Sequence, residues 1–586
     1  MKTKPDIFSP LLLISLGFTA FWNSLKVGFL WDDYLFIIDN AAIKHVKFLP
    51  QIFTHNIAQG SLSPFMYFRP LLELTYMLDY HLWGLTAKGF HFTNILIHIA
   101  VSLSFFWLAK LILKNQRAAL LASCLYIIHP IHVETVACLA GRGDLLCALF
   151  SISCIIFYLK SLSHRNLVSS ILIFLLALLA LMSKENAIML PLIIGFYHLL
   201  HKKSLKFSSF FSLVAAIIFY LLLRIFIVSS PSSLTSQLAK AWTRIPGFFE
   251  SLVHYIRLLI IPYPLYYAIG QRVFSWTQGT VLLGIAFTAL CLFIIFKSRK
   301  RFPWLSFAIA WFFVFLIPYS NIYLIYSYRA DHHLYLPSMG FFLIAGFAAD
   351  KFFETDFTPF IKKSLLGMIM IFYISLTIMQ HNYWIDPILF YKRTLQFSPD
   401  NFSCYYNLGR LYTNRKQFDR AMEYFTKAAS LNHYKVYLTY DAMGTVNRER
   451  GNFEKAAAYY RKAIDYRPNH VPAYNHLGNI YREMGKLDQS LAVLQKATQM
   501  NPYNAQGYYS LGLTYLLKKQ YKEAESAFLK TLEISTEHQH AHFHLAVINK
   551  IKGDIPQAKE WLRKGFPLKK DYQRAYEELS QNKCMP

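Results

Sequence analysis

Long runs of apolar residues constrain this chain more than any other feature. Several approach the roughly 20 residues that a straight helix needs to cross ~30 Å of hydrocarbon. Apolar residues make up 55% of the chain and charged residues only 16%, which excludes a disordered or fully soluble protein. Eleven runs are predicted to be transmembrane helices, near residues 8–29, 91–112, 118–139, 144–160, 167–182, 186–201, 208–228, 279–296, 302–320, 334–350 and 364–381.

Clusters of Lys and Arg predict the orientation of these helices. The net charge of +27 is typical of nucleic-acid-binding proteins, but cytoplasmic loops rich in Lys and Arg explain much of it here. We therefore expect no nucleic-acid partner. If all eleven runs cross once, the basic clusters share one side, which places the N-terminus in the cytoplasm. The stretch 244–262 is interpreted as an interfacial or re-entrant helix rather than a crossing.

After about residue 382 the composition changes to that of soluble helices, and an internal repeat becomes visible. Small residues recur every 34 or 35 positions in two series, which indicates tetratricopeptide repeats, each a pair of helices. The series are Gly409, Gly444, Gly478, Gly512 and Ala546, and Ala421, Ala456, Ser490, Ala524 and Ala558. The predicted fold is therefore all-α: a polytopic membrane domain at 1–382, a linking helix or half repeat at 383–401, and an α-solenoid at 402–586. The solenoid comprises five repeats and a capping helix at 571–582.

Two adjacent carboxylates, Asp32 and Asp33, follow the first apolar run. Partial burial and a like-charged neighbour raise the pKa of a carboxyl group, and such a group can act as a general base. Ionisable groups at membrane depth are often functional. The alternative interpretation is a solvated loop start, and the pattern does not say which of the two would be the base.

Basic side chains gather on the predicted outer side. Arg69, Arg142, Lys184 and Arg329 fall in outer loops or near the membrane surface, where they suit a phosphate group. Arg329 lies in a tyrosine-rich loop, which is also typical of an interfacial aromatic belt.

Several His and Glu residues accompany these cations. His129, His132 and Glu134 could form a metal cluster, but no third ligand group has the spacing of a known metal motif. A pair of helix-end histidines with local hydrogen bonds is the other interpretation. His91 opens the second apolar run, and Glu185 follows Lys184 directly, so Glu185 is expected to orient that amine. Without a Cys-x-x-Cys motif, neither a zinc site nor a disulfide framework is predicted.

Taken together, these segments resemble the transmembrane and tetratricopeptide-repeat-containing O-mannosyltransferases, in a prokaryotic-type form. The most specific of them joins His129 to Leu146. The segments that carry the resemblance are WDD, YFRP, FHFTN, HPIHVETVACLAGRGDLL, SKENAIMLP and RADHHLYLPSMGF, followed by the repeats. The resemblance implies a GT-C fold and an enzyme that moves mannose from a lipid-linked phosphate to Ser or Thr of proteins. Because the cytoplasmic loops are brief and the array is short, we expect a plasma (inner) membrane enzyme that uses a polyprenyl-phosphate sugar.

The resemblance also implies a mechanism and roles for residues. Asp32 or Asp33 takes the proton of an acceptor hydroxyl, which attacks the anomeric carbon with inversion. Cations neutralise the leaving phosphate. The donor-phosphate ligands would be Arg142, Lys184, Arg69 and Arg329, supported by His129, His132, Glu134, Glu185 and His91.

The expected partners are the polyprenyl-phosphate sugar, membrane lipids and a protein or peptide acceptor held by the repeats. No cofactor beyond the lipid-linked donor is expected; a divalent metal is compatible with the site but not indicated. Two alternatives stay open. One is an oligosaccharide ligase or polymerase, or a lipid or cell-wall glycosyltransferase. The other is a membrane-anchored repeat scaffold without catalytic activity.

Overall fold

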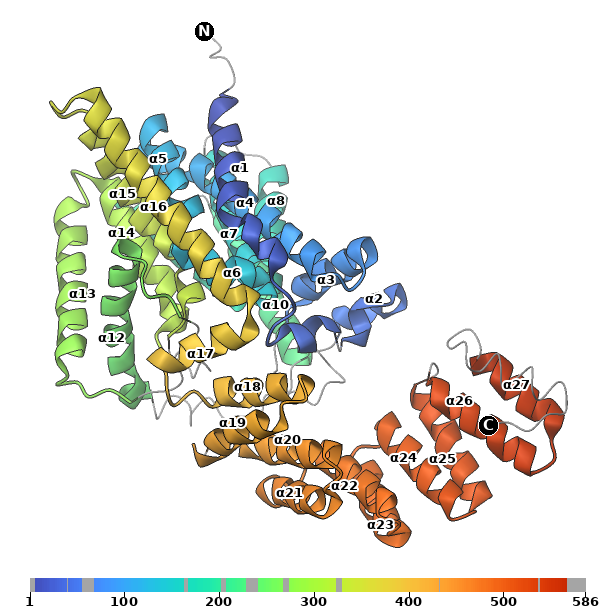
Figure 1. Ribbon diagram of the computed structural model, residues 1–586. Helices are drawn as coiled ribbons and strands as arrows, with labels where there is room; N and C mark the ends of the chain where they lie inside the picture. The colour runs from blue at the N-terminus through green and yellow to red at the C-terminus, as the bar shows by residue number, and fades with distance from the viewer. Residues whose placement is uncertain are drawn as a thin grey trace. The chain divides into compact units, whose positions relative to one another are not determined.

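The computed structural model describes residues 6–38, 40–54, 68–162, 167–201, 207–227, 241–266, 273–322, 329–431, 433–535 and 538–565. Within these ranges the chain consists of helices, turns and loops without a β-strand, and the all-α prediction is confirmed. It divides into two compact units, Met1–Asn401 and Phe402–Pro586. The helices of both units are drawn in Figure 1, and each unit is described by itself below.

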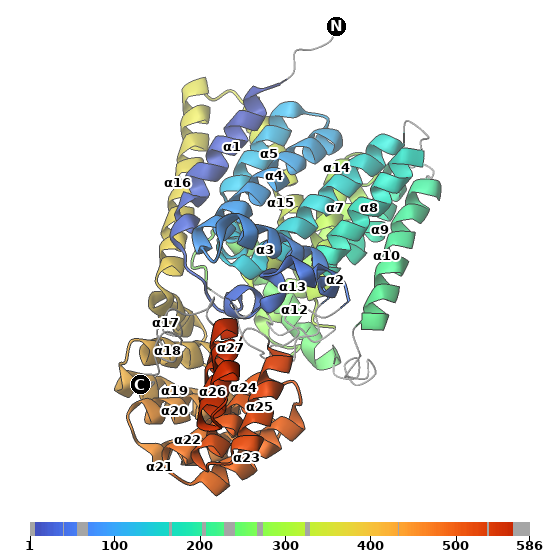
Figure 2. The same cartoon turned by 90° about the vertical axis from the view of Figure 1, so that its right-hand side faces the viewer.

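The first unit contains the apolar helices. They are α1 Phe8–Phe21, α2 Leu49–Ile52, α3 Pro70–Trp83, α4 Ala87–Leu113, α5 Gln116–Ile128, α6 Val133–Ala137, α7 Arg142–Ser161, α8 Leu167–Ser183, α9 Leu190–His201, α10 Phe207–Ile227, α12 Ala241–Ile260, α13 Gly279–Ser298, α14 Pro303–Leu316, α15 Ser338–Phe352, α16 Pro359–Ile385 and α17 Pro387–Phe397. Within this unit, α10 lies at one edge and packs against α8 and α9 (Figure 2).

Six helices among the described residues are long and apolar enough to cross a membrane, so the chain is a membrane protein. A bent pair with 51° between its halves, Gln116–Ile128 and Pro130–Ala137, would make a seventh. Two further apolar helices, Leu167–Ser183 and Pro303–Tyr319, are shorter. The predicted number of eleven crossings therefore stays a prediction. Several predicted runs are broken by prolines and 3₁₀ turns, as at Pro130, and such breaks shorten each helix below the length of a full span.

Helix α12 falls in the stretch interpreted as interfacial or re-entrant. It packs closely along α13, where a Cβ added to Gly284 would lie 2.0 Å from the carbonyl oxygen of Phe249. Tyr373 on α16 donates a hydrogen bond to the carbonyl of Ile260. About two turns further along α16, Gln380 donates to the carbonyl of Leu265. The segment that follows α12 thus lies along α16, and the interfacial or re-entrant character of 244–262 stays a prediction.

The second unit is a row of helix pairs. The pairs are α18 Phe402–Asn414 with α19 Phe418–Ser430, α20 Val436–Glu449 with α21 Phe453–Tyr466, α22 Val471–Glu483 with α23 Leu487–Met500, α24 Ala505–Leu517 with α25 Tyr521–Ile534, and α26 Gln539–Ile551 with α27 Ile555–Gly565. Each pair corresponds to one period of the sequence repeat. The predicted capping helix at 571–582 lies outside the described residues.

Small residues permit the two helices of a pair to touch. A Cβ added to Gly409 would lie 2.4 Å from the ring of Phe425 on the partner helix, and one added to Gly478 would lie 2.5 Å from Leu494. Any larger side chain at these positions would push the helices apart. The recurring glycine in the sequence is therefore a packing requirement of the solenoid.

Candidate active site

The predicted carboxylate pair lies in a tight turn after α1, and its two members have different surroundings. Asp33 is 1% exposed, and its Oδ2 accepts a hydrogen bond from the Leu30 amide at 2.8 Å. Asp32 is only half-buried. Trp31, directly before them, adopts φ 51°, a left-handed conformation that strains a bulky residue and is often found at functional sites. The turn thus holds Asp33 inside and leaves Asp32 partly accessible.

Asp33 is packed against the 3₁₀ turn Leu139–Gly141 and the start of α7. Burial, together with the neighbouring charge of Asp32, raises the pKa of the Asp33 carboxyl to about 8. Asp33 is therefore mostly protonated at neutral pH. A Cβ added to Gly141 would lie 2.4 Å from the Thr135 carbonyl oxygen, so a larger residue would disrupt the turn against which Asp33 packs.

Arg142, predicted to bind phosphate, is fully buried and surrounded by protein partners. Its guanidinium lies 2.6 Å from Asp79 of α3. It also donates to Asn94 Oδ1 at 2.7 Å and to the carbonyl of Phe90 at 2.8 Å, both on α4. Arg142 thus ties the start of α7 to α3 and α4. This geometry does not favour a direct contact with the donor phosphate, and that role remains only a prediction.

Asp79 is a partner that sequence reasoning missed. Its other carboxylate oxygen accepts a hydrogen bond from Thr93 at 2.7 Å, so one acidic side chain joins α3 to two neighbouring segments. The available signal was a carboxylate in the middle of a largely apolar helix, which is costly to bury unless the charge is paired.

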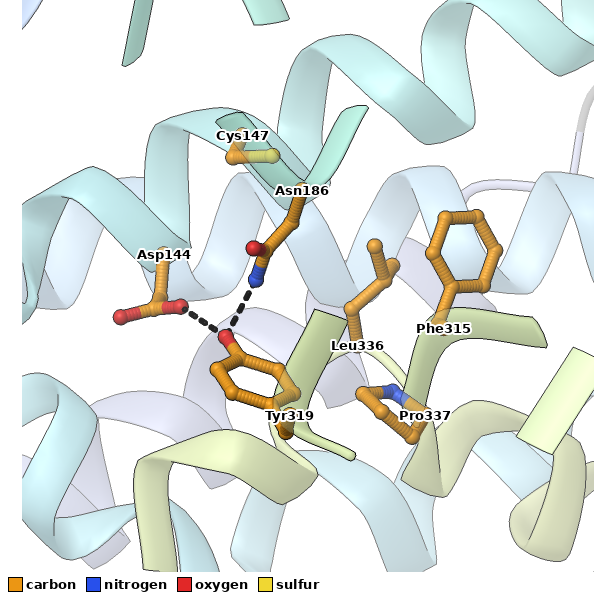
Figure 3. A pocket seen from close by; sticks show the side chains of 7 residues that line it. All are labelled: Asp144, Cys147, Asn186, Phe315, Tyr319, Leu336 and Pro337. Atoms are coloured by element: carbon orange, nitrogen blue, oxygen red, sulfur yellow. Dashed lines mark hydrogen bonds between the residues drawn. The ribbon is translucent and has the colours of Figure 1, made fainter. Parts of the chain in front are cut away.

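Lys184 pairs with a different carboxylate from the one expected. Its ammonium lies 2.7 Å from both oxygens of Asp144. Tyr319 donates to Asp144 at 3.3 Å, and Asn186 donates to the Tyr319 hydroxyl (Figure 3). Glu185 points elsewhere, so the expectation that it orients Lys184 is wrong.

A small cavity lies beside this group of polar side chains. Its volume is about 10 Å³, room for about one water molecule but not for a sugar. The lining residues are Asp144, Cys147, Asn186, Phe315, Tyr319, Leu336 and Pro337 (Figure 3).

Glu185 pairs with arginines instead. Arg69 reaches one of its oxygens through Nη2 at 2.8 Å and Nε at 3.2 Å. Arg224, on the last turn of α10, lies 3.8 Å from the other oxygen. Sequence reasoning did not single out Arg224, because nothing in an apolar helix indicates which distant loop its end approaches.

Glu134 joins the loop before α15 rather than the two histidines near it in sequence. It accepts hydrogen bonds from the backbone amide of Asp331 at 2.9 Å and from His332 Nδ1 at 2.6 Å. The next cation, Arg329, is bound to Glu250 of α12 at 3.1 Å and to the Tyr266 hydroxyl at 2.9 Å. Arg329 therefore also has protein partners, like the other three predicted phosphate ligands.

The predicted supporting histidines lie in the interior of the unit. His91, His129 and His132 are fully buried. The His132 ring lies 4.3 Å from that of Tyr126 and 5.0 Å from that of Tyr335. In the described parts of the chain, no three His, Cys, Asp or Glu side chains are grouped so that they could hold a metal ion.

Residues 133–142 connect the carboxylate turn with the Glu134 group. The Cys138 thiol lies close to the carboxyl groups of Asp32, Asp33 and Glu134. Asp32 and Cys138 are half-buried here, and the side chain of His332 is 25% exposed. The structure thus brings the two carboxylates and Glu134 to one region, with a half-buried carboxylate at its border.

Comparisons with known proteins identify the tetratricopeptide repeats in the second unit. Tetratricopeptide-repeat families match residues 402–434 and 505–538, and a related TPR family matches 444–481 and 478–519. Among solved structures, YrrB, a TPR protein with an unusual peptide-binding site, is 19% identical, with a TM-score of 0.27. That similarity covers 32% of this chain and 97% of YrrB.

The similarity to curated proteins extends over most of the chain. The human protein O-mannosyl-transferase TMTC3 is 25% identical over 530 residues, which are 79% of this chain and 57% of that protein. The Caenorhabditis elegans protein O-mannosyl-transferase F38B6.6 is 26% identical over 422 residues, 68% of this chain and 59% of that protein. This chain therefore spans just over half the length of these relatives. The resemblance noted in the sequence is confirmed: over most of its length, the chain is similar to TMTC-family protein O-mannosyl-transferases.

Proposed function

We propose that this protein is a membrane-embedded, inverting glycosyltransferase. It moves a mannose-like sugar from a polyprenyl-phosphate donor to a Ser or Thr hydroxyl of a protein acceptor on the outer face of the membrane. The names of the curated relatives support the reaction class. The observation that carries the proposal is the carboxylate turn after α1, where a half-buried Asp32 adjoins a buried Asp33.

Asp32 is the proposed general base. A base must come within hydrogen-bond distance of the proton that it removes, and Asp33 is too deeply buried to reach an acceptor hydroxyl. Asp32 accepts the hydroxyl proton as the acceptor oxygen forms a bond to the anomeric carbon. The bond from that carbon to the donor phosphate breaks on the opposite face, and the electron pair leaves with the phosphate. A phosphate is a stable anion, so the step needs no general acid.

Asp33 and Arg142 are proposed to position the base rather than to touch substrate. Asp33 closes the turn through the Leu30 amide. Arg142 fixes the start of α7, against which this turn packs. Small displacements of a base have large effects on rate, so both residues matter without a direct contact.

The donor phosphate is proposed to bind near Arg69 and Lys184. Both cations lie close to the ends of apolar helices and are already oriented by carboxylates. Fixed positive charges stabilise a leaving phosphate more than water does, because they need no reorganisation during the step.

The repeats are proposed to hold the protein acceptor, since stacked helix pairs present an extended binding surface. We also propose that the protein resides in the plasma membrane, with a cytoplasmic N-terminus and the repeats outside. The arrangement of Lys and Arg clusters along the sequence supports that orientation.

Transfer by the purified full chain tests the assignment of the base. Asp32→Asn preserves the size of the side chain and should lower transfer by roughly 10²- to 10⁴-fold, with donor binding unchanged. Asp33→Asn is the matched neighbour. It preserves a hydrogen-bond acceptor for Leu30 and should retain clearly more transfer than Asp32→Asn. If Asp33→Asn abolishes transfer and Asp32→Asn does not, the two roles are reversed; if neither variant changes it, the base is elsewhere.

A further inference from the structure

Three segments of the membrane unit meet at a group of charged side chains that includes Arg224. Arg69 directly precedes α3, Glu185 begins the 3₁₀ turn Glu185–Met189 after α8, and Arg224 lies on the last turn of α10. Glu185 is hydrogen-bonded to Arg69 at 2.8 Å. Its distance of 3.8 Å to Arg224 is within ion-pair range but too long for a hydrogen bond. One carboxylate is therefore shared unequally between two guanidinium groups.

The charges of this region do not cancel. Lys184 and Asp144 lie beside it, since both of them and Glu185 influence the Cys147 thiol. Burial raises the pKa of Glu185, but the charges of Arg69 and Arg224 outweigh burial and hold that pKa below its ordinary value. Glu185 is therefore ionised at neutral pH. The group then has three cations and two carboxylates, an excess of one positive charge, which matches the single negative charge of a phosphate diester.

Arg69 and Arg224 are both more accessible to solvent than Arg142. The side chain of Arg224 is 36% exposed and that of Arg69 is 16% exposed, whereas that of Arg142 is 0% exposed. A planar guanidinium donates two parallel hydrogen bonds to phosphate oxygens. Arg224 is also hydrogen-bonded to the side chain of Tyr220. Its ion pair with Glu185 is long and partly exposed, and such a pair contributes little to stability, so Arg224 can exchange Glu185 for an anion at low cost.

Helix α10 offers a path from the lipid to this group. It lies at the edge of the unit (Figure 2), and large apolar side chains on both sides of Arg224 in sequence, Leu222, Ile225 and Phe226, are exposed. Exposed apolar side chains on a membrane-spanning helix face hydrocarbon. A phosphate carried on a lipid tail can therefore approach Arg224 from within the membrane, with its tail beside α10.

We propose that Arg69, Glu185 and Arg224 form the binding site for the phosphate of a lipid-borne sugar donor. Arg224 supplies the second guanidinium, and the isoprenoid tail lies along the exposed face of α10. The inference rests on the proposed function for the class of donor, but it assigns a ligand to Arg224, which neither the sequence motifs nor the relatives' names indicate.

Equilibrium binding to the full chain tests this site without any transfer reaction. The chain is purified in nanodiscs of zwitterionic lipid, and the probe is polyprenyl phosphate. Polyprenol and inorganic phosphate are compared with it. Arg224→Gln should weaken binding of polyprenyl phosphate roughly 10- to 100-fold, the usual effect of a lost charge-assisted hydrogen bond. Arg224→Lys retains the charge and should lose less. Arg301→Gln, which removes an exposed cation from the loop between α13 and α14, should bind like the native chain.

Several results would overturn the proposal. One is equal binding by Arg224→Gln and Arg301→Gln; another is native binding of polyprenol as tight as that of polyprenyl phosphate. Binding of inorganic phosphate as tight as that of polyprenyl phosphate would show that the isoprenoid tail contributes nothing to binding along α10. Gel filtration confirms that each variant is folded, and Arg224→Lys decides the case if the glutamine variant is not. Binding through Arg224 without sugar transfer would refute the proposed function and leave the site in place; transfer with unchanged Arg224→Gln binding would do the reverse.

Discussion

Removal of Arg142 should destabilise the membrane unit severely, because the arginine is fully buried and paired. It contacts Asp79 at 2.6 Å, Asn94 at 2.7 Å and the Phe90 carbonyl at 2.8 Å. Arg142→Met retains most of the apolar volume but leaves the Asp79 carboxylate, 3% exposed, without its cation. Loss of one partner from a buried ion pair typically costs about 3–5 kcal/mol. We expect a loss of unfolding free energy in that range.

The pH dependence of this loss has a definite sign. Burial raises the pKa of the Asp79 carboxyl even with Arg142 present. Without Arg142 that pKa rises further, because an opposite charge no longer favours the ionised form. Asp79 then takes up a proton more readily as the pH falls, so the damage from Arg142→Met should be smaller at pH 5 than at pH 8. A purely steric defect would show no such dependence.

Unfolding in detergent can be followed with a thiol-reactive dye, because Cys147 and Cys154 of α7 are buried and react only after unfolding. The matched control is the double variant Arg142→Met with Asp79→Leu, which removes both charges. It should lose less stability than the two single variants together, since no unpaired charge remains. Single variants that lose less than about 1 kcal/mol, or a double variant whose loss equals the sum, would refute the argument.

Three further predictions concern other parts of the chain. The pKa of Asp33 is raised from 3.8 to about 8 in the folded chain. The unfolded chain therefore releases this proton at lower pH, and the free energy of unfolding should fall as the pH rises from about 4 to 8. In Asp33→Asn the unfolding temperature should depend less on pH over that window, and an unchanged dependence would contradict the raised pKa. Gly478→Val would force a side chain against Leu494 and should destabilise the repeat unit by about 1–3 kcal/mol. Circular dichroism should show the thermal transition of the repeat unit at a lower temperature, while the transition of the membrane unit stays at the same temperature. In intact cells, a membrane-impermeant thiol reagent should label a single cysteine placed at the exposed Tyr503 of the repeat unit but not one at Arg299; the opposite pattern would mean that the stretch 244–262 crosses the membrane after all.

The repeat unit could be predicted from the sequence because its determinants are local and periodic. A glycine equivalent to Gly478 lies at the contact between the two helices of every pair except the last, where Ala546 takes its place. The period of 34 residues therefore predicts directly how the helices pack. The sequence also predicted that the first unit lies in a membrane, because long apolar runs are typical of helices surrounded by lipid. The number of crossings could not be predicted, because Pro130 and short 3₁₀ turns break apolar runs at points that hydropathy does not resolve.

The charged residues of the candidate site could be named from the sequence, but their partners could not. Arg142 and Asp79, or Arg69 and Glu185, are brought together by tertiary packing across 63 and 116 residues of sequence, respectively, and no period or motif encodes such pairings.

Asp32 and Asp33 are adjacent in sequence and chemically identical. Only the turn at Trp31, with φ 51°, directs one carboxyl inward and leaves the other partly exposed.

This chain is proposed to attach a sugar to protein hydroxyl groups, with Asp32 as the base. Mass spectrometry of surface proteins from cells that express the native chain, or Asp32→Asn at the same level in the membrane, tests it most directly. We expect hexose on Ser or Thr of specific proteins with the native chain, and its near-complete loss with the variant. Identical modification in both, or none with the native chain, would contradict the account.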